Sequence, residues 1–584
     1  MARTPVIFVP GLCGSFNLMV LLDWRGPTLS GWGFPPFISY GKQFLEAFEE
    51  AGYRRERDLF VAFYDWRKSV RDSARLYLKP WIERAKQRSG ASSVILVGHS
   101  MGGLVARSYI QSNDYANDVA RLITLGTPHR GAGEAYYTWG GGEPRSDPSV
   151  KAVLDVYLWY LQNAHPFQTQ LNRLRTIRTQ VPSIRDLLPI DNYLLNDLGA
   201  DRPRPEPLHL ERNLVGALLN QPAHLDLLVG RVPVTTIAGD GFPTIKAIVV
   251  GGPPIPPGDP PRYPDGEPLR DEVDPAGDGT VLTGSARLGH PAVNNLGPLP
   301  GASHGALPDH PTVLGRVFAE LGAETPPLGA PPVEPTRLVL LTASPVTMSV
   351  ETPAGAPIVP PGVLGAQAEA PATPLRRRRV RARDHGHRGK HLNIAVIANP
   401  PAGAYRVQLH GTATGTLALG AMIISATGVT VLAGAEGAAA MPATAPINTE
   451  ISTVHGRVAA GTDLFYEVVV TDTLTAPDVH LDAQATAADA VAKLRAAVGG
   501  RVVLGGAEGD PVATVLGSAT PEVRDPAAAA LSGDEAATDQ VVQALGGAEP
   551  AAMVDALSLV ARDVLGVQDD VLAEALITQL QALT

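Results

Sequence analysis

The chain has 584 residues with a formal net charge of −10, and 45% of its residues are hydrophobic. This length exceeds what one hydrophobic core supports and predicts about two to four domains. The acidic balance argues against nucleic-acid binding, and the one cysteine, Cys13, excludes an internal disulfide. The longest apolar stretch, 417–433, is interrupted by Gly and Thr residues. It favours two strands and a turn, so no transmembrane helix is expected.

The N-terminal part alternates between short apolar runs and amphipathic segments. Strands are expected at 5–9, 59–64, 94–97, 119–125 and 232–238, and helices at 41–51, 73–88, 104–111 and 311–321. Pro80 should bend or break the helix that contains it. The alternation predicts an α/β fold with a parallel, doubly wound sheet.

The clearest local signal is Gly98-x-Ser100-x-Gly102, which follows an apolar run and precedes a segment without helix breakers. A strand, a sharp turn and a helix around this pattern form the context of a nucleophile elbow. Glycine tolerates the close backbone approach on either side of the serine. The free N–H groups of the helix then face any negative charge that develops there. Ser100 is therefore the predicted nucleophile.

Residues 132–230 depart from this alternation and are rich in Tyr, Trp and Leu. An insertion of this length between core strands is typical of a cap or lid. Its composition suits a hydrophobic acyl-chain pocket, but it equally suits an ordinary packed subdomain. Further on, the Pro- and Gly-rich run 251–268 predicts an extended loop.

Four segments together resemble one protein family. They are Val9-Pro10-Gly11, Tyr64-Asp65-Trp66-Arg67, Gly98-His99-Ser100-Met101-Gly102-Gly103 and Thr124-Leu125-Gly126-Thr127-Pro128-His129-Arg130-Gly131. Over about residues 5–320 the chain resembles the lecithin:cholesterol acyltransferase-like and bacterial lipase branch of the α/β-hydrolases. The resemblance implies an α/β-hydrolase domain over residues 1–325 with a cap insertion at about 132–230. In the animal enzymes of this family a disulfide ties the membrane-engaging loop, and this chain cannot form one.

An esterase triad needs a carboxylate that orients the histidine, and in α/β-hydrolases the chain order is Ser, then acid, then His. Two acids downstream of the serine lie between glycines, Asp240 and Asp278. The resemblance places the triad acid at Asp278. Asp240 remains the alternative, although it also suits a turn residue that satisfies its own backbone.

The predicted base is His304, which follows a loop of small residues and precedes the last helix, where the histidine of the family falls. His310 is six residues further on, and we expect it to cap or pack against that helix. His99 and His129 flank the site but precede the acid in the chain. The oxyanion hole is expected from the backbone N–H groups of Leu12 and Met101.

The segment Asp65-Trp66-Arg67 suggests a charged pair with an aromatic residue between its members. Such a cluster can pin a loop near the mouth of an active site, and we favour this structural role over a role in substrate binding.

The second half is rich in Ala, Gly, Pro, Thr and Val, with short strands expected at 336–341, 346–350, 400–411 and 465–470. This pattern predicts a β-sandwich over about 334–477, and it resembles bacterial Ig-like or pre-peptidase accessory domains. The arginine-rich run 375–390 favours a solvated loop over a site for nucleic acid or anionic lipid. Residues 480–584 predict a mostly helical module.

These features predict a serine-dependent carboxylic ester hydrolase or O-acyltransferase that forms an acyl-enzyme with lipid-like esters. No cofactor, metal or nucleic acid is expected, whereas peripheral contact with a lipid surface is compatible with the prediction. The start of the chain has no secretory signal and favours the cytoplasm, although accessory sandwich domains also accompany exported enzymes. The rival interpretation is a catalytically silent hydrolase fold that serves as a binding scaffold.

Overall fold

The computed structural model divides into two compact units, which are described separately. The first covers residues up to 159 and from 167 to 334, and the second contains the strands from residue 335 onward. The structure describes residues 3–17, 20–21, 27–145, 148–164, 173–196, 203–204, 209–252, 260–329, 335–358, 391–413, 415–424, 451–458, 461, 463–472, 477–489, 575 and 578. Within these ranges no helix is long and apolar enough to cross a membrane.

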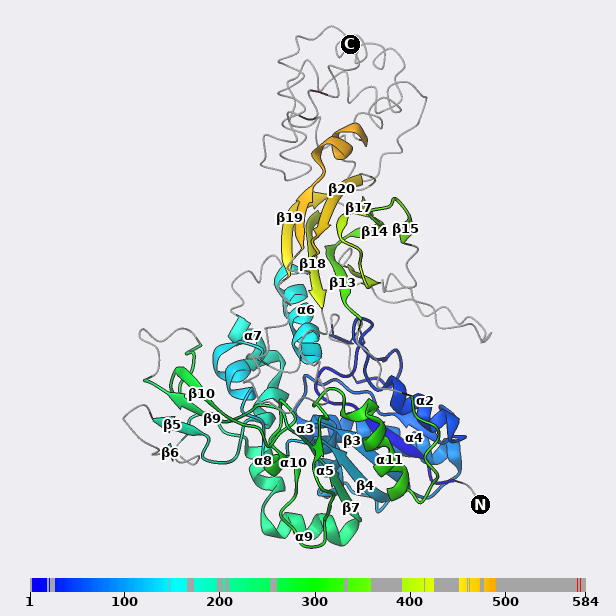
Figure 1. Ribbon diagram of the computed structural model, residues 1–584, viewed down its shortest axis with the longest axis vertical. Helices are drawn as coiled ribbons and strands as arrows, with labels where there is room; N and C mark the ends of the chain where they lie inside the picture. Colours follow the sequence, from blue (N-terminus) through cyan, green and yellow to red (C-terminus); the bar gives the residue numbers. More distant parts are fainter. Residues whose placement is uncertain are drawn as a thin grey trace, which may run out of the picture. The chain divides into compact units, whose positions relative to one another are not determined.

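The first unit is built on a six-stranded sheet in the order β11-β7-β4-β3-β1-β2, in which every pair of neighbours is parallel. Its strands are β1 (Val6–Val9), β2 (Leu59–Val61), β3 (Val94–His99), β4 (Val119–Leu125), β7 (Val234–Ile237) and β11 (Asn294–Asn295). Helices α2 (Lys42–Glu50) and α11 (Pro311–Glu320) cover one face, and α5 (Met101–Ile110) contacts the sheet from the other (Figure 1). The predicted α/β fold class is confirmed.

The order of the strands in the sheet reverses direction at β1. The chain passes from β1 to β2 on one side and then returns to β3 on the other side of β1. In open α/β sheets ligands bind at such a reversal, outside the carboxyl ends of the strands. The loops that begin at Pro10 and Ser100 follow β1 and β3 and therefore meet at this point.

The helix expected at 73–88 is interrupted before Pro80. Residues Val70–Ser73 form α3, Ala74–Leu78 form a π-helical turn, and Lys79–Ser89 form α4, in which Pro80 occupies the first turn. A proline lacks the backbone N–H that an interior position would use, and this loss is harmless in a first turn. The π-helical turn therefore lies where the hydrogen-bonding pattern is already broken.

The segment between β4 and β7 contains α6 (Pro148–Ala164), α7 (Arg173–Gln180), β5 (Leu194–Asn196), β6 (Pro203–Arg204), α8 (Leu214–Leu219) and α9 (Pro222–Arg231). Strands β5 and β6 join β9 (Thr244–Val250) and β10 (Pro268–Asp274) in a second sheet, ordered β10-β9-β5-β6. Strands β5 and β6 precede β7 in the sequence, whereas the antiparallel pair β9–β10 follows it. This second sheet therefore combines strands from the inserted segment with strands that come after β7. The sequence patterns did not predict β9 or β10.

The second unit consists of two antiparallel sheets, ordered β16-β13-β18-β19 and β15-β14-β17-β20-β21. Their strands are β13 (Arg337–Ser344), β14 (Val346–Glu351), β15 (Pro357–Ile358), β16 (His391–Ala398), β17 (Gly403–Gly411), β18 (Gly415–Ile424), β19 (Ser452–Val458), β20 (Asp463–Val470) and β21 (Asp478–Leu481). Apolar residues from both sheets form one core, which is the arrangement of a β-sandwich. Residues 483–489 are helical, whereas the arginine-rich run at 375–390 and most of the helices predicted beyond it lie outside the described residues.

Candidate active site

The turn between β3 and α5 holds Ser100 in a conformation that non-glycine residues rarely adopt, with φ 53° and ψ −129°. The surrounding glycines leave no room for a side chain. A Cβ on Gly102 would lie 2.1 Å from the Val9 carbonyl oxygen, and one on Gly103 would lie 2.0 Å from Thr127 Oγ1. Backbone strain of this kind persists only where the surrounding structure enforces it. The turn therefore has the geometry of a nucleophile elbow.

The side chains of Ser100, His304 and Asp278 form one line of hydrogen bonds. His304 Nε2 lies 2.9 Å from Ser100 Oγ, and His304 Nδ1 lies 2.8 Å from Asp278 Oδ2. Because Asp278 is buried, as is His304, the pair is shielded from water. A carboxylate in this position fixes the histidine tautomer that leaves Nε2 free to accept the serine proton.

Asp278 is also held through its second oxygen, which accepts hydrogen bonds from the backbone N–H groups of Thr280 (3.1 Å) and Val281 (2.7 Å). The other predicted acid, Asp240, belongs to β8 (Gly239–Asp240). Its carboxylate accepts a hydrogen bond from Thr283 Oγ1 at 3.3 Å. The structure thus brings Asp278, and not Asp240, to the histidine.

The two predicted oxyanion donors lie in the loops that follow β1 and β3. Met101 begins α5, so its backbone N–H belongs to the first turn, where amides have no acceptor within the helix. Leu12 follows Gly11, whose backbone runs directly against the nucleophile. A Cβ on Gly11 would lie 2.9 Å from Ser100 Cβ and 3.4 Å from its Oγ. Both loops therefore border the space in front of Ser100.

The remaining histidines of this region have other partners. His310 caps α11, since its side chain accepts a hydrogen bond from the N–H of Thr312 at 3.2 Å, as expected. His99 lies beside the base, with Nε2 2.9 Å from the backbone oxygen of His304 and Nδ1 2.7 Å from the hydroxyl of Tyr40. Sequence reasoning missed Tyr40, because nothing in its local pattern connects it with a histidine far along the chain.

His129 and Arg107 form a second buried polar cluster behind the elbow. Arg107 Nη1 lies 3.1 Å from His129 Nδ1, and its Nη2 donates to the carbonyl of Leu219 at the end of α8. Burial lowers the pKa of Arg107 to about 9. Burial, and then the nearby Arg107 charge, lower the pKa of His129 well below its usual value. This cluster connects the elbow helix to the inserted segment.

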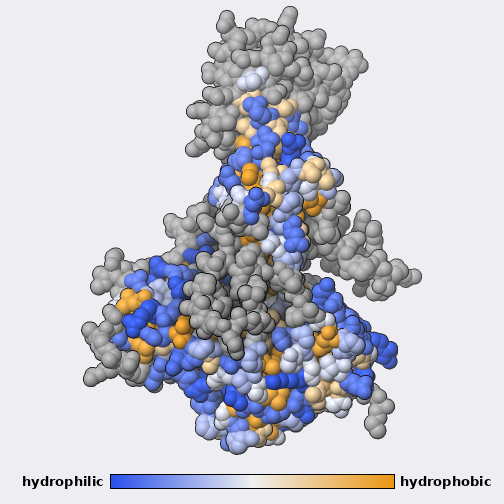
Figure 2. Space-filling view, in the orientation of Figure 1, coloured by the Kyte–Doolittle hydropathy of each residue, from blue (hydrophilic) through white to orange (hydrophobic). Residues whose placement is uncertain are grey.

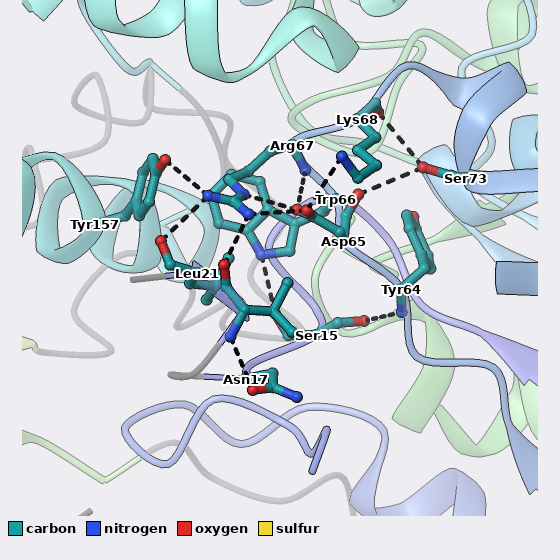
Figure 3. A network of polar contacts seen from close by, with 11 residues as sticks. Ser15, Asn17, Leu21, Tyr64, Asp65, Trp66, Arg67, Lys68, Ser73 and Tyr157 are labelled. Carbon is teal, nitrogen blue, oxygen red and sulfur yellow. Dashed lines mark hydrogen bonds and ion pairs between the residues drawn. The ribbon is translucent and has the colours of Figure 1, made fainter. Parts of the chain in front are cut away.

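Asp65, Trp66 and Arg67 pin the loop after β1, as the sequence suggested (Figure 3). Arg67 makes two hydrogen bonds of 2.8 and 2.9 Å to Asp65, and Trp66 Nε1 donates to the carbonyl of Ser15 at 2.9 Å. Arg67 also donates to the carbonyls of Val20 and Leu21 and to the hydroxyl of Tyr157. Burial acts to lower the pKa of Arg67, but its bonds with the neighbouring acid raise it overall.

The described residues contain no group of three or more His, Cys, Asp or Glu side chains that could hold a metal ion.

Comparisons with known proteins agree with the motifs. Phospholipase A(1) LCAT3 of Arabidopsis thaliana is 37% identical over 91 residues, which are 15% of this chain and 20% of that protein. Lysosomal phospholipase A and acyltransferase of Canis lupus familiaris is 28% identical over 150 residues, 25% of this chain and 34% of the relative. The chain thus spans about a third or less of the length of these curated relatives.

Among solved structures, the mature lipase BlEst2 of Bacillus licheniformis matches with a TM-score of 0.29 and 18% identity, over 55% of this chain and 93% of that one. The family model described as lecithin:cholesterol acyltransferase matches residues 38–151, the segment that contains both the Tyr-Asp-Trp-Arg motif and the elbow. The resemblance drawn from the motifs is confirmed, and over this segment the chain is similar to lecithin:cholesterol acyltransferase.

Proposed function

We propose that the chain is a serine ester hydrolase that acts on lipid-like acyl esters through an acyl-enzyme. One observation carries this proposal, the unbroken line of hydrogen bonds from Asp278 through His304 to Ser100. His304 Nε2 accepts the Ser100 proton as Oγ attacks the ester carbonyl carbon, and then gives this proton to the departing alcohol. Asp278 stabilises the imidazolium that forms between these two steps.

The negative charge of the tetrahedral intermediate falls on the former carbonyl oxygen. The proposed donors are the amides of Leu12 and Met101, which belong to the two loops next to Ser100. Removing one such donor typically costs about 3–4 kcal/mol of transition-state stabilisation. A side-chain substitution leaves the backbone N–H in place and does not test these donors directly. A test must instead displace the loop that carries the donor.

The substrate class is proposed from the relatives, whose names include phospholipase A(1) and lysosomal phospholipase A. A phospholipid contains carboxylic esters of fatty acids, and this is the type of bond that the proposed acyl-enzyme chemistry cleaves. The second of these names also includes acyltransferase, which supports an alcohol as a second acceptor beside water. Both acceptors use the same three side chains, because each attacks the same acyl-enzyme with its proton taken by His304.

The test is hydrolysis of p-nitrophenyl esters with two to sixteen acyl carbons, together with labelling by a fluorophosphonate. Ser100→Ala should abolish both turnover and labelling, and a preference for long chains would support a lipid substrate. Ser108→Ala, which removes a buried hydroxyl from the same helix, is the matched control and should retain both. Failure of the wild-type chain to react with either reagent would instead support the silent scaffold.

Partition between the acceptors is measured by adding a short alcohol to the same assay. An acyltransferase yields the new ester at the expense of the free acid, with the rate of p-nitrophenol release unchanged if acylation is rate-limiting. A pure hydrolase yields the free acid alone.

We also propose peripheral contact with lipid aggregates. Figure 2 shows small apolar patches between larger hydrophilic areas on the visible face. Among the residues that the structure describes, four large apolar side chains are more than half exposed, namely Leu210, Leu214, Leu269 and Val273. The double variant Leu210→Ser and Leu214→Ser should co-sediment less with phosphatidylcholine vesicles while hydrolysing a soluble ester at the wild-type rate. Equal co-sedimentation would contradict this contact.

A further inference from the structure

Two buried residues without a role in the proposed reaction, Tyr40 and His99, connect the loop after β1, which carries Leu12, to the base His304. The backbone N–H of Gly11 donates to the hydroxyl of Tyr40 at 2.9 Å. This hydroxyl lies 2.7 Å from His99 Nδ1, and His99 Nε2 lies 2.9 Å from the backbone oxygen of His304. Tyr40 and His99 are both buried, so water does not readily compete for these hydrogen bonds. One line of hydrogen bonds therefore runs from the loop after β1 to the loop that carries the base.

The direction of each hydrogen bond follows from the groups at its ends. A backbone carbonyl can only accept, so His99 Nε2 must carry a proton and donate it to His304. In a neutral imidazole Nδ1 is then an acceptor, and the hydroxyl of Tyr40 must donate to it. This leaves the lone pairs of the same hydroxyl to accept from Gly11. All three hydrogen bonds are thus satisfied together by one protonation state.

The surroundings of His99 favour this neutral state. Burial, and then the charge of His304, lower the pKa of His99 well below its usual value. The two imidazole rings lie 4.9 Å apart between their centroids. When His304 gains a proton during the reaction, a second cation at this distance is disfavoured. His99 can therefore keep its hydrogen bonds unchanged while its neighbour changes charge.

Both ends of this line bear on the reacting atoms. Gly11 directly precedes Leu12, and its backbone lies against Ser100. At the other end, the backbone of His304 is held on two sides, since its N–H donates to the carbonyl of Asp278 at 2.8 Å and its carbonyl accepts from His99. This line of hydrogen bonds therefore joins the loop that carries the proposed oxyanion donor Leu12 to the loop that carries the base His304.

We propose that Tyr40 and His99 are positioning residues that hold the Leu12 amide and the His304 ring in register with each other around Ser100. The proposal rests on the proposed esterase function. Neither side chain contacts the substrate carbonyl in this scheme, so the effect of each is transmitted through the backbone of Gly11 or of His304. Misplacement of catalytic groups by about 1 Å costs on the order of a hundredfold in rate.

The first test is Tyr40→Phe, which keeps the ring and removes the hydroxyl that joins Gly11 to His99. We expect kcat for p-nitrophenyl esters to fall by about ten- to a hundredfold with KM within about twofold, because a misplaced donor weakens only the transition state. A boronic acid inhibitor, which forms a tetrahedral adduct with the serine, should lose affinity by a similar factor.

The matched control is Tyr109→Phe, which removes another buried hydroxyl of the same unit, one that donates to Asp118 at 2.8 Å. It should lower thermal stability to a comparable degree and leave kcat unchanged. Tyr40→Phe with the kcat of this control would overturn the proposal. A rise in KM at constant kcat would also overturn it, since that result places Tyr40 in ground-state binding.

The second test separates the two ends of the line at His99. His99→Gln supplies an N–H near the Nε2 position and loses the contact with Tyr40, whereas His99→Asn retains an acceptor near Nδ1 and loses the contact with His304. If the residues act as one unit, Tyr40→Phe added to His99→Gln lowers kcat no further than the larger single effect. Multiplying losses would show independent roles and overturn the proposal.

A measurement without turnover guards against variants that do not fold. In nitrogen NMR of the chain labelled with [15N]histidine, the His99 signals are identified as those that disappear in His99→Gln. At pH 7 they should be those of a neutral imidazole with its proton on Nε2. A proton on Nδ1 of His99 would overturn the proposal. Inactivity of the wild-type chain would contradict the proposed function, whereas an active wild type with an equally active Tyr40→Phe contradicts only this inference.

Discussion

The interiors of the two units differ in kind. The sandwich core consists of apolar side chains from two sheets, and its few buried polar groups among the described residues pair locally, as Asn393 does with Thr342 and the carbonyl of Val346. Among the described residues the sandwich buries one charged side chain, Arg337, whereas the first unit, the hydrolase unit, buries many, including Asp65, Arg67 and Arg107. Buried charge costs free energy unless it is hydrogen-bonded.

This difference shows which interior is built only for stability. An apolar core gains free energy from every methylene that it buries, whereas some of the buried polar groups of the hydrolase unit, including His99, Asp278 and His304, lie at the elbow and in the loops that border it. We therefore expect substitutions inside the sandwich to change stability alone, and substitutions in the polar interior to change activity, stability or its pH dependence according to position.

The largest expected effect is that of Asp278→Asn, which replaces the acceptor of His304 Nδ1 with a side chain that can donate. The wrong histidine tautomer then faces Ser100, and kcat should fall by about 10⁴-fold while the unfolding free energy changes little. Ester hydrolysis and urea unfolding measure the two quantities. Asp240→Asn is the control, and a comparable loss of activity there would reassign the acid.

The buried pair of Asp65 and Arg67 should affect stability strongly. Arg67→Met leaves the Asp65 carboxylate buried without its main partner, which should lower the unfolding free energy by about 3–5 kcal/mol. The double variant with Asp65→Asn should lose less than the single one, because no unpaired charge remains. Urea unfolding of the three chains measures this, and a single-variant loss below about 1 kcal/mol would contradict burial of the charge.

In the sandwich, Leu340→Ala removes a fully buried side chain of β13. We expect an unfolding free energy lower by about 2–5 kcal/mol, with kcat unchanged. Thr347→Ala, at an exposed position of β14, should change stability by less than about 0.5 kcal/mol. Calorimetry and the ester assay on the same samples measure stability and kcat. A lower kcat in folded Leu340→Ala would contradict the expected difference between the two interiors.

The smallest effect depends on pH. Burial raises the pKa of Asp186 to about 6, although its carboxylate accepts a hydrogen bond from the N–H of Val70. A folded-state pKa above the unfolded value means that the charged form opposes folding above pH 6, and that this cost disappears as the pH falls towards 4. Asp186→Asn should therefore be more stable than the wild type by about 1–3 kcal/mol at pH 8 and equally stable at pH 4. A stability difference that is constant with pH would contradict this assignment.

Local patterns were sufficient to predict the parts of the fold that are continuous in sequence. The apolar run before Ser100, the glycines around it and the helix after it lie in one short stretch, so the elbow could be predicted. The alternation in β14 and β17 likewise follows directly from a half-buried strand. Strands β9 and β10 were not predicted, because a segment of the insertion completes their sheet and this pairing leaves no signal in the local sequence.

The candidate site divides in the same way. Ser100, Asp278 and His304 could be named because chain order and a family resemblance restrict the choice of acid and base, and the structure places them within hydrogen-bonding distance. Tyr40 could not be named, because its role depends on a hydroxyl that meets His99 across 59 positions of the chain. No periodicity or motif encodes a contact of that range.

The separation of the contacts of His304 along the chain has a consequence for synthesis. Its side chain reaches Ser100 across 204 positions and its carbonyl reaches His99 across 205. A nascent chain on the ribosome therefore carries a finished elbow long before it has a base, and closing so long a loop is among the slower events of folding. Recovery of esterase activity after refolding should thus lag behind the return of secondary structure, and it reports the moment at which the whole hydrolase unit has closed.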